Sequence, residues 1–206
     1  MAKVSIARKV KRNPDQLRAA SKHICWGMRA FSARLEYVLQ LFHRFPNKDI
    51  GGVGSAITDS FLLHARRMIE FFYCTSNDVF PDDILAEDFF TTYQVWRNIR
   101  PAYPPILDQA KSKLSKLLVH FTYQVTDYSS GKMTWEVSEI YMGVFFALQE
   151  FIKNVDQSLL DDDFTYLNID NPNIVICHPI FDPADKSKYQ FACTRDKASG
   201  LDILVG

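Results

Sequence analysis

The sequence predicts an all-α protein, an up-and-down bundle of about five helices with a short β-rich C-terminal tail. Apolar residues recur at helical spacing in five segments, and stretches rich in Pro, Gly or Asn separate these segments. After Phe164 the helical period disappears, and short runs of β-branched and aromatic residues replace it. We therefore expect a basic N-terminal arm over residues 1–13, a helical bundle over 14–160 and an extended appendage over 161–206.

Length and composition exclude several classes of protein. The 206 residues are 47% hydrophobic and 14% aromatic, so the chain can bury a sizeable core and is not intrinsically disordered. No apolar run approaches the ~18–20 residues of a membrane-spanning helix, and the basic N-terminus lacks an apolar stretch typical of a secretory signal. We expect a cytoplasmic protein without membrane contact, a transit peptide being the alternative. The four cysteines show no metal-site spacing, so we expect them to be reduced and expect no metal or cofactor.

The first two predicted helices are long and are separated by a glycine-rich segment. The first begins with Asn13 as N-cap, followed by a proline, and ends near Phe45, where another proline follows. Residues 51–54, Gly-Gly-Val-Gly, are expected to form a flexible link. Ser55 is expected to cap the second helix, which ends near residues 74–77.

Prolines and turns separate three further predicted helices. The third begins at Pro81 with acidic residues in its first turn, which suits the helix dipole. Its buried side consists of Leu85, Phe89, Tyr93 and Trp96. The fourth runs from about Ile106 to Val125, and the fifth is capped by Thr134 and closes at residues 161–163. Short strands are expected in the tail at residues 166–169, 174–177 and 189–193, with a further candidate at 201–205.

A polar ridge follows one flank of the fourth predicted helix. Lys113, Lys116 and His120 are three and four residues apart, so they share one face beside the apolar stripe. Two ammonium groups could bind a phosphate, while an imidazole with an ordinary pKa of about 6.5 could transfer protons. A simple solvent-exposed face is the alternative interpretation.

The stretch Lys113–Tyr123 resembles the R-x(4–6)-H segment of HEPN-domain proteins, and it is most similar to uncharacterised bacterial proteins with a HEPN-like bundle. Residues 60–67 and 82–89 also resemble that group, over a total of about residues 14–155. The resemblance implies a HEPN-like homodimer that acts as a metal-independent RNase, in which an Arg steadies the scissile phosphate and a His transfers protons. Lys113 stands where the Arg would be and lacks its bidentate fork. A degenerate, non-catalytic member is therefore the alternative.

Two hypotheses of function follow. In the first, a HEPN-like protein binds RNA or cleaves it without a metal, with His120 as general acid/base and Lys113 and Lys116 as phosphate-binding cations. In the second, the chain is a non-catalytic helical interaction module that acts through homodimerisation or a protein partner. His64 lies in the apolar stripe of the second helix, either as a core histidine or, with Arg67 one turn on, in support of His120.

Charge is distributed unevenly along the chain. The formal net charge is zero, but residues 1–34 hold nine of the 24 basic residues and one of the 24 acidic residues, which leaves 15 basic and 23 acidic residues elsewhere. The basic N-terminus could contact RNA or an acidic partner, or it could simply be solvated. Two acidic groups could suggest metal ligands but are better explained as a helix start and a solvated run: Asp82, Asp83, Glu87 and Asp88, and Asp161, Asp162 and Asp163.

Overall fold

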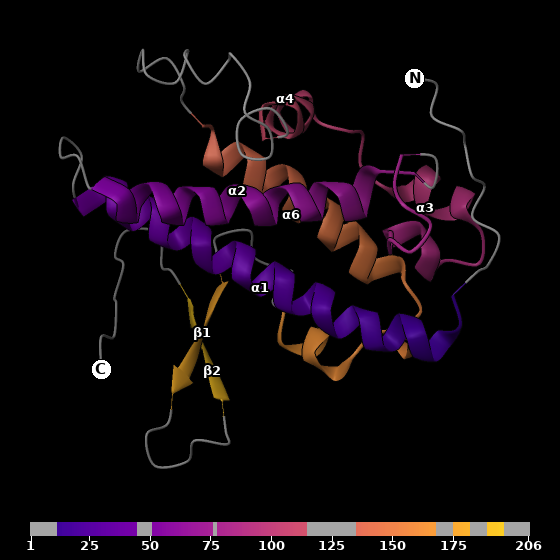
Figure 1. The fold of residues 1–206 in the computed structure, drawn as a ribbon. Helices are drawn as coiled ribbons and strands as arrows, with labels where there is room; N and C mark the ends of the chain where they lie inside the picture. Colours follow the sequence, from indigo (N-terminus) through magenta and orange to yellow (C-terminus); the bar gives the residue numbers. More distant parts are fainter. Residues whose placement is uncertain are drawn as a thin grey trace.

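The computed structural model describes residues 12–44, 51–75, 78–114, 135–167, 175–181 and 189–195. Most of this part is helical, which confirms the predicted all-α bundle (Figure 1). Its α-helices are α1 (Pro14–Arg44), α2 (Gly51–Tyr73), α3 (Tyr93–Ile99), α4 (Pro105–Leu114) and α6 (Val137–Asn154). Its shorter elements are the 3-10 helices η1 (Ala86–Phe89), η3 (Gln157–Leu159) and η4 (Asp162–Tyr166), and the strands β1 (Val175–Phe181) and β2 (Tyr189–Arg195).

The start of α1 is as predicted. The Asn13 carboxamide oxygen accepts a hydrogen bond from the backbone N–H of Gln16 at 2.8 Å, and the Gln16 side chain accepts one from the Asn13 N–H at 3.2 Å. This reciprocal arrangement satisfies two backbone donors that a helix start leaves without partners. Helix α1 is described as far as Arg44, and the predicted end near Phe45 lies outside the described residues.

The predicted flexible link at residues 51–54 is wrong, because α2 begins at Gly51 and contains all four of these residues. Ser55 is therefore inside the helix and is not its N-cap. Glycine in a helix interior is about 1 kcal/mol less favourable than alanine. Gly54 is nevertheless buried, and its carbonyl oxygen accepts a hydrogen bond from the Thr58 hydroxyl at 3.0 Å. Packing at this end of the helix outweighs the local preference of the glycines.

The predicted third helix is interrupted. Turns follow Pro81, and the short helix η1 and the helix α3 come after them. The Asp83 carboxylate accepts a hydrogen bond from the Phe80 N–H, and the Asp88 carboxylate accepts one from the Leu85 N–H, both at 2.8 Å. The bond to Asp83 stabilises a turn, whereas Asp88 accepts its bond from Leu85, the N-cap residue of η1, and so helps to start that short helix.

The last two predicted helices are confirmed in part. Helix α4 is described from Pro105 to Leu114, and the predicted continuation to Val125 and the Thr134 cap lie outside the described residues. Helix α6 corresponds to the fifth predicted helix but ends at Asn154.

The aspartates at 161–163 begin a helix, whereas the sequence interpretation placed them at a helix end. The Asp161 carboxylate accepts a hydrogen bond from the Asp163 N–H at 3.0 Å and so caps η4. Asp162 forms an ion pair with Arg18 of α1 at 2.8 Å, which ties this segment to the first helix.

Aromatic rings from four elements form the centre of the core. Phe151 of α6 is fully buried, and the centroid of its ring lies 5.4–6.0 Å from the centroids of five other rings, those of Phe71, Phe72, Phe89, Phe90 and Trp96. Helix α4 packs closely on α6, because a Cβ atom added at Gly143 would lie 3.1 Å from the Leu107 side chain. The core therefore holds one side of α2 and leaves its other side free for the site described below.

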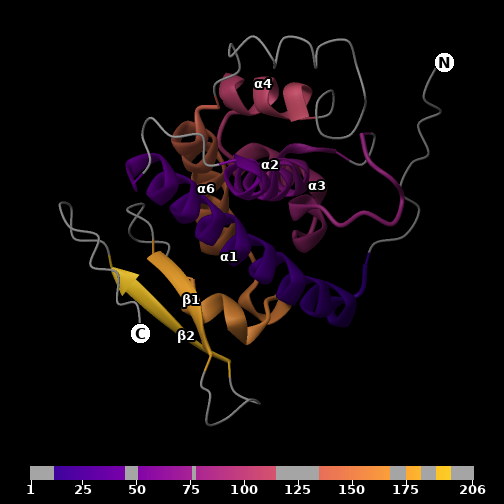
Figure 2. The ribbon, with the colours of Figure 1, turned by 60° about the vertical axis from the view of Figure 1, so that its left-hand side comes forward.

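Helix α2 lies between α1 and α4 (Figure 2). Helices α1 and α2 run side by side in opposite directions, and α6 packs against both of them (Figures 1 and 2). No helix in the described ranges is both long and apolar enough to cross a membrane.

Strands β1 and β2 pair antiparallel, with Cys177 opposite Cys193, and β1 contacts α1. They include the positions of the strands expected at residues 174–177 and 189–193, except residue 174. Tyr166 belongs to η4 and not to a strand, and the candidate at 201–205 lies outside the described residues.

Candidate functional site

The predicted Lys113, Lys116 and His120 ridge falls mostly outside the described part of the chain. Only Lys113 is within it, on α4, where its side chain is partly buried. The Lys113 ammonium nitrogen lies 5.7 Å from the centroid of the Trp135 ring, within the range of a cation–π interaction. That Lys113, Lys116 and His120 share one face of a helix stays a prediction.

The two residues predicted to support that ridge, His64 and Arg67, line an open groove on α2. Its volume is about 460 Å³, and its lining consists of Ser60, Leu63, His64, Arg66, Arg67 and Glu70. Four of these positions are three or four residues apart in succession and so share one face of the helix. The opposite face of α2 carries fully buried residues such as Phe61 and Phe72, so the core fixes the position of the groove.

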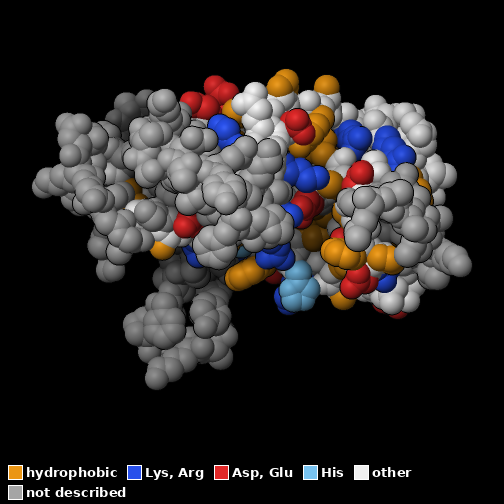
Figure 3. All heavy atoms as spheres, turned by 45° about the horizontal axis from the view of Figure 1, so that its top comes forward, with side chains coloured by type: hydrophobic (Ala, Val, Ile, Leu, Met, Phe, Trp, Pro, Cys, Tyr) orange, Lys and Arg blue, Asp and Glu red, His pale blue; other side chains and the backbone are white. Residues whose placement is uncertain are grey.

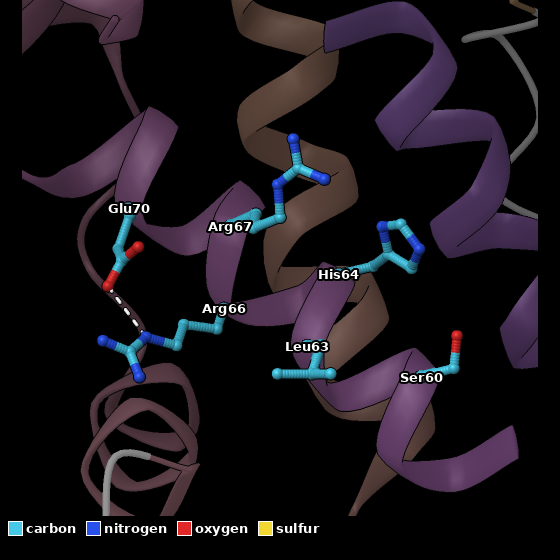
Figure 4. Close-up of a pocket in the computed structure, with 6 residues that line it drawn as sticks. All are labelled: Ser60, Leu63, His64, Arg66, Arg67 and Glu70. Atoms are coloured by element: carbon cyan, nitrogen blue, oxygen red, sulfur yellow. Dashed lines mark hydrogen bonds and ion pairs between the residues drawn. The ribbon is translucent and has the colours of Figure 1, made fainter. Parts of the chain in front are cut away.

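Two arginines line the groove, and only one of them, Arg66, is paired with an acidic residue (Figure 4). Arg66 Nε lies 2.9 Å from a carboxylate oxygen of Glu70, one turn further on, so these two charges largely compensate each other. Arg67 is exposed and makes no hydrogen bond or ion pair with any other residue that the structure describes. Leu63 lies between the paired residues and His64 in Figure 4.

A further arginine reaches the groove from α1. Arg34 Nε donates a hydrogen bond to the Ser60 hydroxyl oxygen at 3.1 Å. On the face of the molecule that Figure 3 shows, basic side chains over the middle of the surface lie among acidic ones. The groove thus combines Arg34, Arg67 and an imidazole with one acidic residue, Glu70, which already has a partner.

His64 lies at the edge of the groove and is not a buried core histidine. Its ring makes an edge-on contact with Trp26 of α1, at a centroid distance of 6.4 Å and an interplanar angle of 76°. Its Nδ1 atom is buried and has no hydrogen-bond partner among the described residues. Burial lowers the pKa of His64 from its ordinary value of 6.5, and the positive charges of Arg67 and Arg34 lower it further. At neutral pH the imidazole is therefore uncharged and can both donate and accept a hydrogen bond.

This lowered pKa predicts a pH dependence of stability. Below pH 6.5 the unfolded chain binds a proton at His64 more readily than the folded chain does, so stability falls as the pH decreases through this range. We expect His64→Gln to remove this part of the decrease. Urea unfolding of wild type and variant on both sides of that pH measures it, with His23→Gln on the exposed side of α1 as the control. An unchanged pH slope in His64→Gln would contradict the assignment.

Three of the acidic residues considered as metal ligands have other partners. Asp83 and Asp88 accept hydrogen bonds from backbone N–H groups, and Glu87 pairs with Arg97 Nε at 2.8 Å. In the part of the chain that the structure describes, no group of three His, Cys, Asp or Glu residues is arranged to hold a metal ion.

Sequence reasoning missed the two residues that α1 contributes to this site. Arg34 and Trp26 lie on α1, and their contacts with Ser60 and His64 depend on how two helices align. A helical period shows which residues share a face of one helix, but it does not show the register between two helices. The one available signal was the regular spacing of Ser60, His64 and Arg67 along α2.

Comparisons with known proteins found no protein similar to this chain. The chain matches no protein-family model, and neither the curated proteins nor the solved structures gave a match. The interpretation of the groove therefore depends on its own geometry and charge.

Proposed function

We propose that this protein binds RNA and that the α2 groove is the binding site for the phosphate backbone. The observation that carries the proposal is the charge around the groove. Arg34 and Arg67 flank a neutral His64, and the one acidic lining residue is already paired with Arg66. Guanidinium groups bind phosphate oxygens through charge-assisted hydrogen bonds, and a neutral imidazole supplies a further donor.

The openness of the groove favours a polymer over a small ligand. Sites for small molecules are usually concave and mostly apolar, and they bury most of the ligand. This groove runs along the exposed side of one helix and is lined mostly by polar side chains. The resemblance of residues 113–123 to a HEPN motif also supports RNA as the anion, and a HEPN-like identity of the bundle is part of the same proposal.

Cleavage of the bound RNA is the second part of the proposal. Here His120 would act as general acid/base, with Lys113 and Lys116 steadying the phosphate and no metal required. Its support is the resemblance alone. A non-catalytic interaction module that acts as a homodimer or through a protein partner is the competing function. The exposed apolar side chains Trp26 and Leu63 beside the groove favour it.

We expect the wild-type protein to bind a short fluorescent RNA at low salt, and Arg34→Gln and Arg67→Gln each to weaken binding about 10-fold. A hydrogen bond to a charged group contributes about 1.5–3 kcal/mol, and 1.4 kcal/mol corresponds to a factor of ten. Fluorescence anisotropy over a range of salt concentrations measures the affinity and the salt dependence, which should decrease in both variants. The matched control is Lys153→Gln, which removes one exposed positive charge from α6.

The outcomes separate the parts of the proposal. If wild type binds no RNA, the RNA proposal is wrong. If both groove variants bind like Lys153→Gln, RNA binds elsewhere on the protein. Incubation with RNA in EDTA tests cleavage separately, and equal cleavage by wild type and His120→Ala would exclude a role for that histidine.

A further inference from the structure

The Trp26 side chain is unusually exposed beside the groove. Its relative accessibility is 60%, although tryptophan is among the most extensively buried residue types on average. It is not a loose surface side chain, because its ring contacts His64 edge-on across the α1–α2 interface. The ring is therefore positioned by the neighbouring helix while much of its surface stays open to solvent.

A second apolar side chain adjoins the same place. Leu63 lies one position before His64, lines the groove and is 47% exposed. Positive charge borders this apolar surface, since Arg67 lies one turn beyond Leu63 on α2 and Arg34 reaches α2 through Ser60. A flat aromatic ring next to guanidinium groups is the arrangement with which proteins bind single-stranded nucleic acids.

We propose that Trp26 stacks against a base of single-stranded RNA while Arg67 and Arg34 bind neighbouring phosphates. The inference rests on the proposed function and names its substrate class. In a duplex the base faces are covered by their neighbours, and an A-form helix exposes mainly its phosphates and 2′-hydroxyls. Only an unpaired strand can turn a base onto the ring. Stacking tolerates every base, so the site binds single strands with little sequence preference.

The size of the effect follows from measured stacking contributions. Removal of an aromatic side chain that stacks on one base corresponds to a loss of about 5- to 150-fold in affinity. We expect Trp26→Ala to weaken binding of a single-stranded RNA within that range and Trp26→Phe to retain most of the affinity. Phe80→Ala is the matched control, because Phe80 is an exposed aromatic residue between α2 and η1, outside the groove lining.

The experiment compares three RNA probes by anisotropy: a single strand, a duplex of equal length, and the same single strand with its bases removed. The expected result is that Trp26→Ala loses affinity for the intact single strand alone. The loss of affinity caused by Trp26→Ala and the loss caused by removing the bases should also not be additive, because both changes remove the same stacked pair. Equal losses for all three probes would overturn the inference, because Trp26 would then act through the structure of the site.

Three other results overturn the inference in distinguishable ways. If Trp26→Ala binds every probe like wild type while Arg67→Gln still weakens binding, RNA binds the groove but no base stacks on the ring. If Trp26→Ala turns a dimer into a monomer in sedimentation and leaves RNA affinity unchanged, the ring belongs to a dimer interface. If the wild-type protein binds none of the probes, both the proposed function and this inference are wrong.

Discussion

Replacing Phe151 with alanine is expected to lower the free energy of unfolding by about 3–5 kcal/mol, the usual range for a fully buried phenylalanine. Phe151 is completely buried, and its ring contacts five aromatic rings contributed by α2, η1, α3 and the segment between them. Truncation removes these contacts and leaves a cavity that large rings cannot easily fill. Because edge-on aromatic pairs add to simple burial, we expect a value near the upper end.

Phe146 on the same helix provides the matched control. Its side chain is 48% exposed, so Phe146→Ala removes the same atoms from a place where water already replaces part of the packing. We expect it to change the free energy of unfolding by less than about 1 kcal/mol. Urea denaturation followed by circular dichroism measures both variants. Similar losses for Phe146→Ala and Phe151→Ala would mean that the aromatic cluster is not the centre of the core.

This core also determines the arrangement of the side chains that line the groove. Phe72, on the face of α2 opposite the groove, packs on Phe151, while Arg67 and Glu70 are among the residues that line the groove on the other face. A helix held on one side by large rings keeps its opposite side chains in a defined arrangement. The proposed RNA site thus depends on the core for its geometry, although none of the core rings lines the groove.

The long helices could be predicted because their signals are local. Asn13 and Gln16 cap α1 within one turn, and the apolar stripes of α1, α2 and α6 are visible without knowing what packs on them. Residues 51–54 could not be assigned in the same way. Glycine has a poor helix propensity, and only burial, which the sequence does not show directly, makes a helix favourable there.

The acidic segments illustrate the opposite case, in which a local signal was available and was misinterpreted. Asp83 was taken as a favourable charge at a helix start, yet it binds the Phe80 N–H in a turn, and a helix begins only later, where Asp88 binds the N–H of the N-cap residue of η1. Aspartate does both things, and the choice depends on whether the following residues can be buried. Asp161 was likewise placed at a helix end, although it caps the next short helix.

The candidate site could be predicted only within a single helix. The spacing of His64 and Arg67 placed them on one face of α2, as the structure shows. The contributions of Arg34 and Trp26 could not be foreseen, because they cross from α1 at a register that neither helix specifies alone. The lowered pKa of His64 depends on the same two-helix arrangement, since Arg34 contributes to it.

The Arg97–Glu87 ion pair gives the second large expected effect. Arg97 Nε lies 2.8 Å from a Glu87 oxygen, and their side chains are 31% and 1% exposed. The hydrogen bond to Glu87 is the main cause that raises the pKa of Arg97. We expect Arg97→Met to cost about 3–5 kcal/mol near neutral pH, because it leaves a buried carboxylate without the guanidinium. Glu87→Gln should cost less, since water can solvate much of the remaining charge of Arg97.

A double variant tests this explanation, with the surface pair Lys153 and Glu150 as control. Arg97→Met/Glu87→Gln should be more stable than Arg97→Met alone, because it no longer buries the carboxylate without the guanidinium. Lys153→Met should cost at most about 1 kcal/mol, because both partners in that pair are accessible to water. Urea unfolding near neutral pH measures all the variants. A double variant no more stable than Arg97→Met, or equal losses for Arg97→Met and Glu87→Gln, would show that packing of the arginine stem and not charge compensation stabilises this corner of the bundle.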